Sequence, residues 1–130
     1  MKFNKLTPNL VVNDVAASMK FYGDVLGFKK AFTVPEASPF IFGAMTNGSV
    51  ELFFNDRKAV GEDYPPLAAW PAGGALTLFI EVEGIREILK SVEKSGAKII
   101  MPLKKQFYGM EEFAFEDPDG WIITIAERVS

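Results

Sequence analysis

The chain of 130 residues contains no histidine and no cysteine. Those two side chains supply many transition-metal ligands, catalytic bases and nucleophiles. Any chemistry must therefore come from carboxylates, hydroxyls, amides, aromatic rings and the lysine and arginine side chains. Glu51 is the leading carboxylate candidate, because it stands in the apolar run Val50-Glu51-Leu52-Phe53, which is typical of a strand.

Glu51 has three roles that the sequence leaves open. In the first, its carboxylate bonds to neighbouring threonine hydroxyls and holds the structure together. In the second, it anchors a cationic or hydroxyl-bearing ligand. In the third, it is a general base whose pKa is raised in an apolar cleft. No partner base, nucleophile or oxyanion donor is recognisable from spacing, so no catalytic residue is assigned beyond this candidate.

The strands and helix that would position Glu51 are followed by a second set in the same order. The first half predicts a strand, a helix between Asp14 and Gly27, and three more strands, at residues 5–13, 28–34, 40–46 and 49–55. The second half predicts the same order, with a helix at 84–95 and strands at 75–83, 97–101, 110–116 and 121–127. Both halves are therefore expected to be βαβββ modules.

Local signals mark the ends of these elements. Asp14 is expected to cap the first helix, and Gly27 and Gly96 are expected to end the two helices. Asn47-Gly48 is typical of a tight hairpin turn, and the run 117–120 (DPDG) of a type I turn.

A long connection, residues 56–74, is rich in Pro, Gly and Ala and carries Trp70. Its length favours a lid, an arm or a functional loop, although a plain linker with a surface Trp is the equal alternative. The whole chain is predicted to be one domain, with module one at 1–55, this connection, and module two at 75–130.

This pattern resembles the vicinal oxygen chelate superfamily, which contains glyoxalases, extradiol dioxygenases and bleomycin-resistance proteins. The resemblance covers nearly the whole chain and rests on short motifs in a fixed order: Asn13-Asp14, Phe21-Tyr22, Leu26-Gly27-Phe28, Tyr108-Gly109 and Asp117-Pro118-Asp119-Gly120. It implies an α+β fold in which tandem βαβββ modules form a curved mixed sheet with a central cleft and helices outside. It also implies a homodimer.

Metal enzymes of this superfamily take one ligand from the first and last strand of each module. Strand-by-strand matching places these four positions at Thr7, Glu51, Thr77 and Thr124. A catalytic metal needs about three good protein ligands, and neutral hydroxyls are poor ones. The resemblance therefore implies a scaffold without the family's metal site, and we expect no metal and no cofactor.

Strand alternation places a mixed set of side chains on the face that would line the cleft. Small hydroxyls, amides, two carboxylates and phenylalanine rings share this face, and buried carboxylates at Glu51 and Glu81 would be costly unless a ligand met them. We therefore favour a binding pocket over a filled interior. The expected ligand-binding residues, including loop aromatics that could close over the cleft, are Thr7, Asn9, Glu51, Phe53, Trp70, Thr77, Phe79, Phe107, Tyr108, Met110 and Thr124. The adjacent Glu111 and Glu112 are interpreted as a solvated strand start.

The composition and charge of the chain exclude some classes of binding partner. The net charge is −3 and no run of Lys or Arg suggests a surface that follows phosphates, so nucleic acid is not an expected partner. Apolar runs are too short for a membrane span, and the N-terminal residues have no signal-peptide core. Absence of cysteine fits a reducing cytoplasm.

These observations predict a metal-free protein that binds a small, partly aromatic molecule, such as an antibiotic or metabolite that it sequesters. The competing class is an enzyme, either a glyoxalase-like lyase or isomerase, a dioxygenase, or a metal-independent enzyme that uses Glu51 as its base. A third class is a structural or partner-binding dimer whose cleft is filled.

Overall fold

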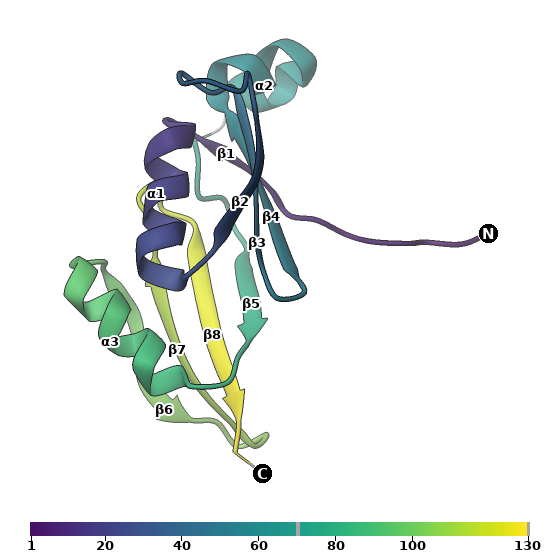
Figure 1. Cartoon of the computed structure of the whole chain (residues 1–130). Coiled ribbons are helices and arrows are strands. Elements are labelled where there is room, and N and C mark those ends of the chain that lie inside the picture. The colour runs from purple at the N-terminus through teal and green to yellow at the C-terminus, as the bar shows by residue number, and fades with distance from the viewer. Residues whose placement is uncertain (70, 130) are drawn as a thin grey trace. The chain divides into compact units, whose positions relative to one another are not determined.

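Each half of the chain forms a four-stranded mixed sheet with an α-helix on one face (Figure 1). The computed structural model describes residues 1–69 and 71–129. They divide into two compact units, Met1–Ala72 and Gly73–Ser130. The α+β class and the repeated βαβββ order predicted from the sequence are confirmed; one domain with a central cleft stays a prediction.

The first unit holds the strand order β1-β4-β3-β2, in which β1 runs parallel to β4 and the other pairs are antiparallel. Its elements are β1 (Asn9–Val12), α1 (Val15–Leu26), β2 (Lys29–Val34), β3 (Phe42–Asn47), β4 (Val50–Asp56), α2 (Arg57–Asp63) and the 3-10 helix η1 (Pro65–Ala69).

Helix α1 begins and ends where local chemistry requires. The Asp14 side chain accepts a hydrogen bond from the Ala17 backbone N–H at 3.1 Å, and Gly27 ends the helix in the left-handed conformation, with φ of 72°. The buried side of α1 packs on the sheet, where the Tyr22 ring lies 4.9 Å from the Phe54 ring, and both residues are fully buried. Both predicted helix signals are therefore confirmed.

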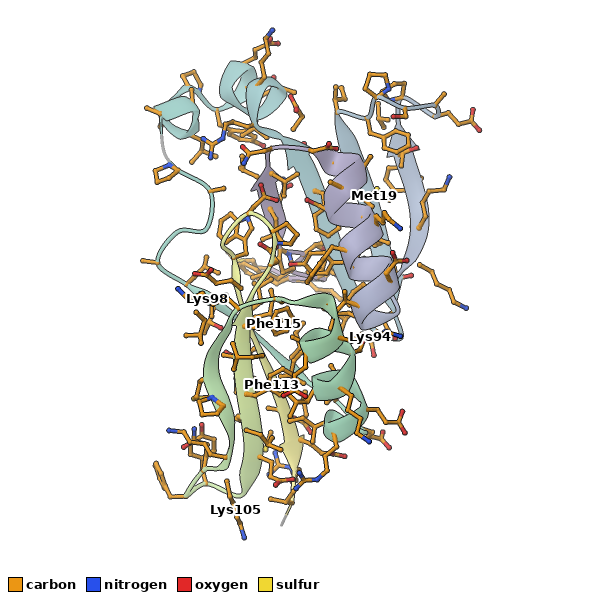
Figure 2. All side chains as sticks on the ribbon, turned by 90° about the vertical axis from the view of Figure 1, so that its left-hand side faces the viewer. Met19, Lys94, Lys98, Lys105, Phe113 and Phe115 are labelled. Carbon is orange, nitrogen blue, oxygen red and sulfur yellow. The ribbon has the colours of Figure 1, made fainter. Side chains whose placement is uncertain are left out.

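The second unit repeats this architecture in the order β5-β8-β7-β6, with β5 parallel to β8. Its elements are β5 (Thr77–Glu81), α3 (Ile85–Ser95), β6 (Ile99–Lys105), β7 (Met110–Glu116) and β8 (Ile122–Arg128). Helix α3 packs against β7 and β8. The rings of Phe113 and Phe115 are fully buried and supply much of this core (Figure 2).

The hairpin and turn signals are confirmed. Asn47 and Val50 face each other across the turn that contains Gly48, whose φ is 57°. Gly120 donates its backbone N–H to the Asp117 carbonyl at 3.0 Å, closing the turn before β8.

Two predicted strand bounds were wrong by four residues, and a helix in the connection was missed. Strand β1 starts at Asn9 rather than residue 5, because Pro8 has no N–H to extend the ladder. Strand β6 continues to Lys105 instead of ending at residue 101, since bulges absorb Pro102. The connection 56–74 is not a plain loop, because Asp56 caps α2 through the Ala59 N–H at 3.2 Å.

No helix in the part of the chain that the structure describes is long and apolar enough to span a membrane.

Candidate functional site

The parallel strands of the first sheet bring together Thr7 and Glu51, 44 residues apart. The segment before β1 leaves the sheet on the side away from α1 (Figure 1), and the Thr7 hydroxyl donates a hydrogen bond to Glu51 Oε1 at 3.0 Å. The Lys5 ammonium lies 2.6 Å from the same oxygen. Glu51 is thus held by one hydroxyl and one cation from its own module.

This environment sets the direction of the Glu51 pKa. The hydrogen bond from Lys5 and then that from Thr7 stabilise the charged form, and they lower the pKa below its ordinary value of 4.5. The general-base reading required the pKa to rise. Within the first unit, therefore, the surroundings of Glu51 favour its structural or anchoring role over the general-base role among the three that the sequence left open.

The matching positions of the second sheet also form a pair. The hydroxyl oxygens of Thr77 on β5 and Thr124 on β8 lie 2.6 Å apart, and Thr77 also donates to the Ile122 carbonyl at 3.2 Å. Thr124 is 7% exposed. The strand matching that located these positions in the sequence therefore selected residues that are neighbours within each module.

The four positions do not fit a transition metal. One pair offers a carboxylate already bound to an ammonium, and the other offers two hydroxyls bound to each other. Neutral hydroxyls are poor ligands for such ions. Among residues 1–69 and 71–129, no group of three or more His, Cys, Asp or Glu side chains is placed to hold a metal ion.

The face of the first sheet opposite α1 carries a row of aromatic rings. The Phe32 and Phe42 rings lie 5.6 Å apart, and the Phe42 and Phe53 rings lie 5.0 Å apart, so three adjacent strands contribute one ring each. Phe32 is 51% exposed, and the other two are half-buried. Beside this row, Asn55 donates a hydrogen bond to Asn9 across β4 and β1.

This aromatic row was found only in part from the sequence. Phe53 and Asn9 were predicted, but Phe32 and Phe42 were not, although both alternate onto the same face in register: Phe32 faces Ala44, which faces Phe53. Lys5 was also missed, because no periodicity links a residue before β1 to a carboxylate on β4. The period-two pattern of β2 and β3 was the available signal for the two rings.

The remaining predicted residues are distributed over the second unit. Phe79 on β5 is 54% exposed, while Phe107 and Tyr108 lie in the turn between β6 and β7, with their rings 5.0 Å apart. Met110 had been grouped with the loop residues that could close over the cleft. Instead it begins β7 and is buried. Trp70 lies outside the described residues.

Two carboxylates differ from expectation. Glu81 is exposed, so the cost of burying it cannot favour a pocket. Glu112, interpreted as a solvated residue, is only 3% exposed because its side chain lies on the inner part of β7, where the Tyr108 hydroxyl donates to its Oε2 at 2.7 Å. Glu111 faces the other way and pairs with Arg86 at 2.8 Å.

A cavity of about 600 Å³ lies in the first unit, where β1 and β4 end side by side. The Arg57 Nε donates to Asn13 Oδ1 at 3.3 Å on its wall. The residues that line the cavity are Asn13, Asp56, Arg57, Lys58, Gly61, Glu62 and Ala68. It lies at the strand ends, so it is separate from the aromatic row.

Solved structures share this fold. The virulence protein STM3117 of Salmonella typhimurium is 27% identical over 124 residues, covering 92% of this chain and 81% of that protein. Its crystal structure has a TM-score of 0.73 and 22% identity, covering 99% and 100% of the two chains. The structure of TioX from Micromonospora sp. ML1 has a TM-score of 0.78 and 18% identity, covering 97% and 99%.

A third similar structure is a glyoxalase/bleomycin resistance protein/dioxygenase family enzyme from Burkholderia phytofirmans PsJN, with a TM-score of 0.79 and 21% identity over 94% of this chain and 96% of that one. At these identities the structural likeness shows the fold alone. The sequence match is broader, because the family described as the Glyoxalase/Bleomycin resistance protein/Dioxygenase superfamily matches residues 2–125. The chain belongs to that superfamily.

Proposed function

We propose that this protein binds a small, partly aromatic molecule without a metal, in the manner of the bleomycin-resistance members of its superfamily. The observation that carries the proposal is the row formed by Phe32, Phe42 and Phe53 beside the Glu51 carboxylate. A planar ligand on this row would stack on rings while a polar group met the carboxylate or the amides of Asn9 and Asn55.

The neighbourhood of Glu51 supports binding over turnover. A carboxylate whose pKa is lowered by an ammonium stays ionised near neutral pH, which suits an electrostatic anchor and does not suit a proton acceptor. The donor set at the family's four ligand positions gives no Lewis-acid site. Sequestration of an aromatic antibiotic or metabolite by a homodimer is the form of this function that we propose.

The test is a thermal-shift screen of planar aromatic compounds against the purified chain, each with and without added Ni²⁺, Mn²⁺ or Fe²⁺. A ligand that binds the folded state at about 100 times its Kd adds roughly 2.7 kcal/mol of apparent stability. We expect aromatic hits whose shifts do not change with metal. Hits that require a stoichiometric metal would overturn the proposal.

A matched pair of variants localises the site. Phe32→Ala removes a ring that is 51% exposed, and Ile100→Ala removes an apolar side chain that is 44% exposed on β6. Because neither side chain is in a core, both variants should keep their fold. Affinity for the hit should fall in Phe32→Ala and stay unchanged in Ile100→Ala; equal effects would place the ligand elsewhere.

A further inference from the structure

Glu112 stands apart from the other carboxylates of its sheet. It is 3% exposed, and among the described residues its one hydrogen-bond or ion-pair partner is the neutral phenol of Tyr108, at 2.7 Å from Oε2. Its neighbour Glu111 pairs with Arg86, and Glu127 accepts the backbone N–H groups of Gly84 and Ile85. Glu112 alone is withdrawn from water without a cation or backbone donors.

The chain builds this contact through the turn between β6 and β7. Gln106 donates its N–H to the Met110 carbonyl at 2.7 Å, and Gly109 donates to the Gln106 carbonyl at 3.2 Å. Lys105, labelled in Figure 2, marks the end of β6 where this turn leaves the sheet. The tight turn directs the Tyr108 side chain toward Glu112, four positions later in the chain. The adjacent Phe107 is 98% exposed.

The neighbours of Glu112 on its face are small or apolar apart from two exposed cations, Lys104 on β6 and Arg128, two positions after Ala126 on β8. In the strand register, Ala126 on β8 lies directly opposite Glu112 on one side, and Lys104 on β6 lies opposite on the other. Ala114, two positions along β7, is also buried. Lys104 is exposed and makes no ion pair with Glu112 in the part of the chain that the structure describes.

A carboxylate in such surroundings is stabilised by a cation that donates hydrogen bonds to it. Removal from water disfavours the charged form, and one neutral hydrogen bond satisfies only one of the two oxygens. The second oxygen, Oε1, accepts no hydrogen bond from a described residue and reaches the surface, since no fully buried side-chain oxygen among the described residues lacks a partner. A primary ammonium, with three donors and a full charge, matches that oxygen best.

We propose that Glu112, oriented by the Tyr108 hydroxyl, binds the protonated primary amine of a small ligand whose apolar part lies against Phe107. The rings of Phe107 and Tyr108 lie 5.0 Å apart at 86°, and this pair offers ring faces that attract a cation and its apolar substituents. The site is built entirely within the second unit, and it goes beyond the proposed function, whose aromatic row belongs to the first unit.

The test uses isothermal titration calorimetry on the full chain with two matched probes, 2-naphthylmethylamine and 2-naphthalenemethanol. They share the ring and differ in charge. Because a hydrogen bond to a charged group is stronger than one between neutral groups, we expect the amine to bind about tenfold to a hundredfold more tightly than the alcohol. Glu112→Gln should reduce that preference to within about threefold, since the charge is gone and the shape is kept.

Two control variants separate Glu112 from its surroundings. Glu111→Gln removes the adjacent charge, which faces away and pairs with Arg86, and it should leave the preference for the amine unchanged. Lys104→Met removes the cation across the strand and should keep or increase the preference. Loss of the preference in Lys104→Met would show that discrimination between the probes depends on Lys104 and not on the Glu112 charge, and would overturn the proposal.

A measurement on the unmodified chain tests the proposal even if the Glu112→Gln variant does not fold. The side-chain carboxyl ¹³C resonance of Glu112 should shift saturably with the amine, at the midpoint found by calorimetry, and should not shift with the alcohol. If the alcohol binds as tightly as the amine, the inference about Glu112 is overturned while the proposed function stands. If neither probe binds, the amine site is overturned, while the stacking of planar ligands on Phe32, Phe42 and Phe53 is tested separately by the thermal-shift screen and Phe32→Ala.

Discussion

The Lys5 ammonium lies 2.6 Å from Glu51 Oε1. The Thr7 hydroxyl donates to the same oxygen at 3.0 Å. Glu51 is therefore an anion already paired with a cation, beside the aromatic row of Phe32, Phe42 and Phe53.

The first prediction concerns that pair. In Lys5→Met the largest cause of the lowered Glu51 pKa is removed, so the Glu51 pKa should rise toward 4.5 while the smaller effect of Thr7 remains. The measurement is an NMR titration of the Glu51 side-chain carboxyl in both proteins. Lys2→Met, which removes another exposed lysine of the same segment, should leave the titration as in the wild type. An unchanged Glu51 titration in Lys5→Met would contradict the ion pair.

The second prediction concerns Glu127, which caps α3 in place of the missing side chain of Gly84. Its carboxylate accepts from the Ile85 and Gly84 N–H groups, each at 3.0 Å, and these bonds lower its pKa below 4.5. Stability from a lowered carboxyl pKa is fully present above the unfolded pKa, and it is lost as pH falls through the folded pKa. Wild type should therefore exceed Glu127→Gln in stability at pH 7, and the difference should shrink below about pH 4.

Chemical unfolding at pH 7 and pH 3 measures that difference. Glu83→Gln is the matched control, because Glu83 is exposed next to the same helix and accepts no hydrogen bond from a described residue. Its effect should be small at both values of pH. A difference for Glu127→Gln that is equal at pH 7 and pH 3 would refute the proposed cap.

The caps also show how far sequence reasoning reaches. Asp14, Gly27 and the Asn47-Gly48 hairpin were predicted correctly because each signal acts within a few residues of its own helix or turn. The βαβββ repeat was predicted for the same reason, since periodicity is local. The cap of α3 was not predicted, because the carboxylate that accepts its N-terminal hydrogen bonds belongs to Glu127, which is 42 residues away from Ile85.

The candidate site was predictable where strand alternation decides which sheet face a side chain occupies. It was unpredictable where a side chain contacts a residue on another segment of the chain. Thr77 and Thr124, both named from strand alternation, are neighbours because β5 and β8 pair directly, although their binding role stays a prediction. Glu112 was misassigned as solvated, since its burial depends on Tyr108 folding back from a turn. The helix α2 was missed because the composition of 56–74 is typical of a loop, although Asp56 supplies a good cap.

The third prediction concerns packing between α1 and the first sheet. A methyl group at Gly43 on β3 would collide with Met19 Sδ and lie 3.2 Å from Val15 Cγ1, on the helix labelled through Met19 in Figure 2. Gly43→Ala should therefore destabilise the fold by about 1–3 kcal/mol through overpacking. Urea unfolding gives the free energy.

A double-mutant cycle identifies the cause. Met19→Ala alone should cost about 2–5 kcal/mol, because Met19 is 7% exposed and its removal leaves a cavity. Since the new methyl group enters space that Met19 vacates, the double variant should be more stable than the sum of the two single effects. Strict additivity would show that the two positions do not compete for space.

The central claim is that the scaffold binds a partly aromatic ligand without a metal. The most direct measurement is calorimetric titration of an aromatic hit into the chain, first after exhaustive EDTA treatment and then with added Ni²⁺ or Mn²⁺. The donor chemistry at Thr7, Glu51, Thr77 and Thr124 predicts the same Kd in both conditions, within about twofold. Binding that vanishes after EDTA and returns with one equivalent of metal would contradict it.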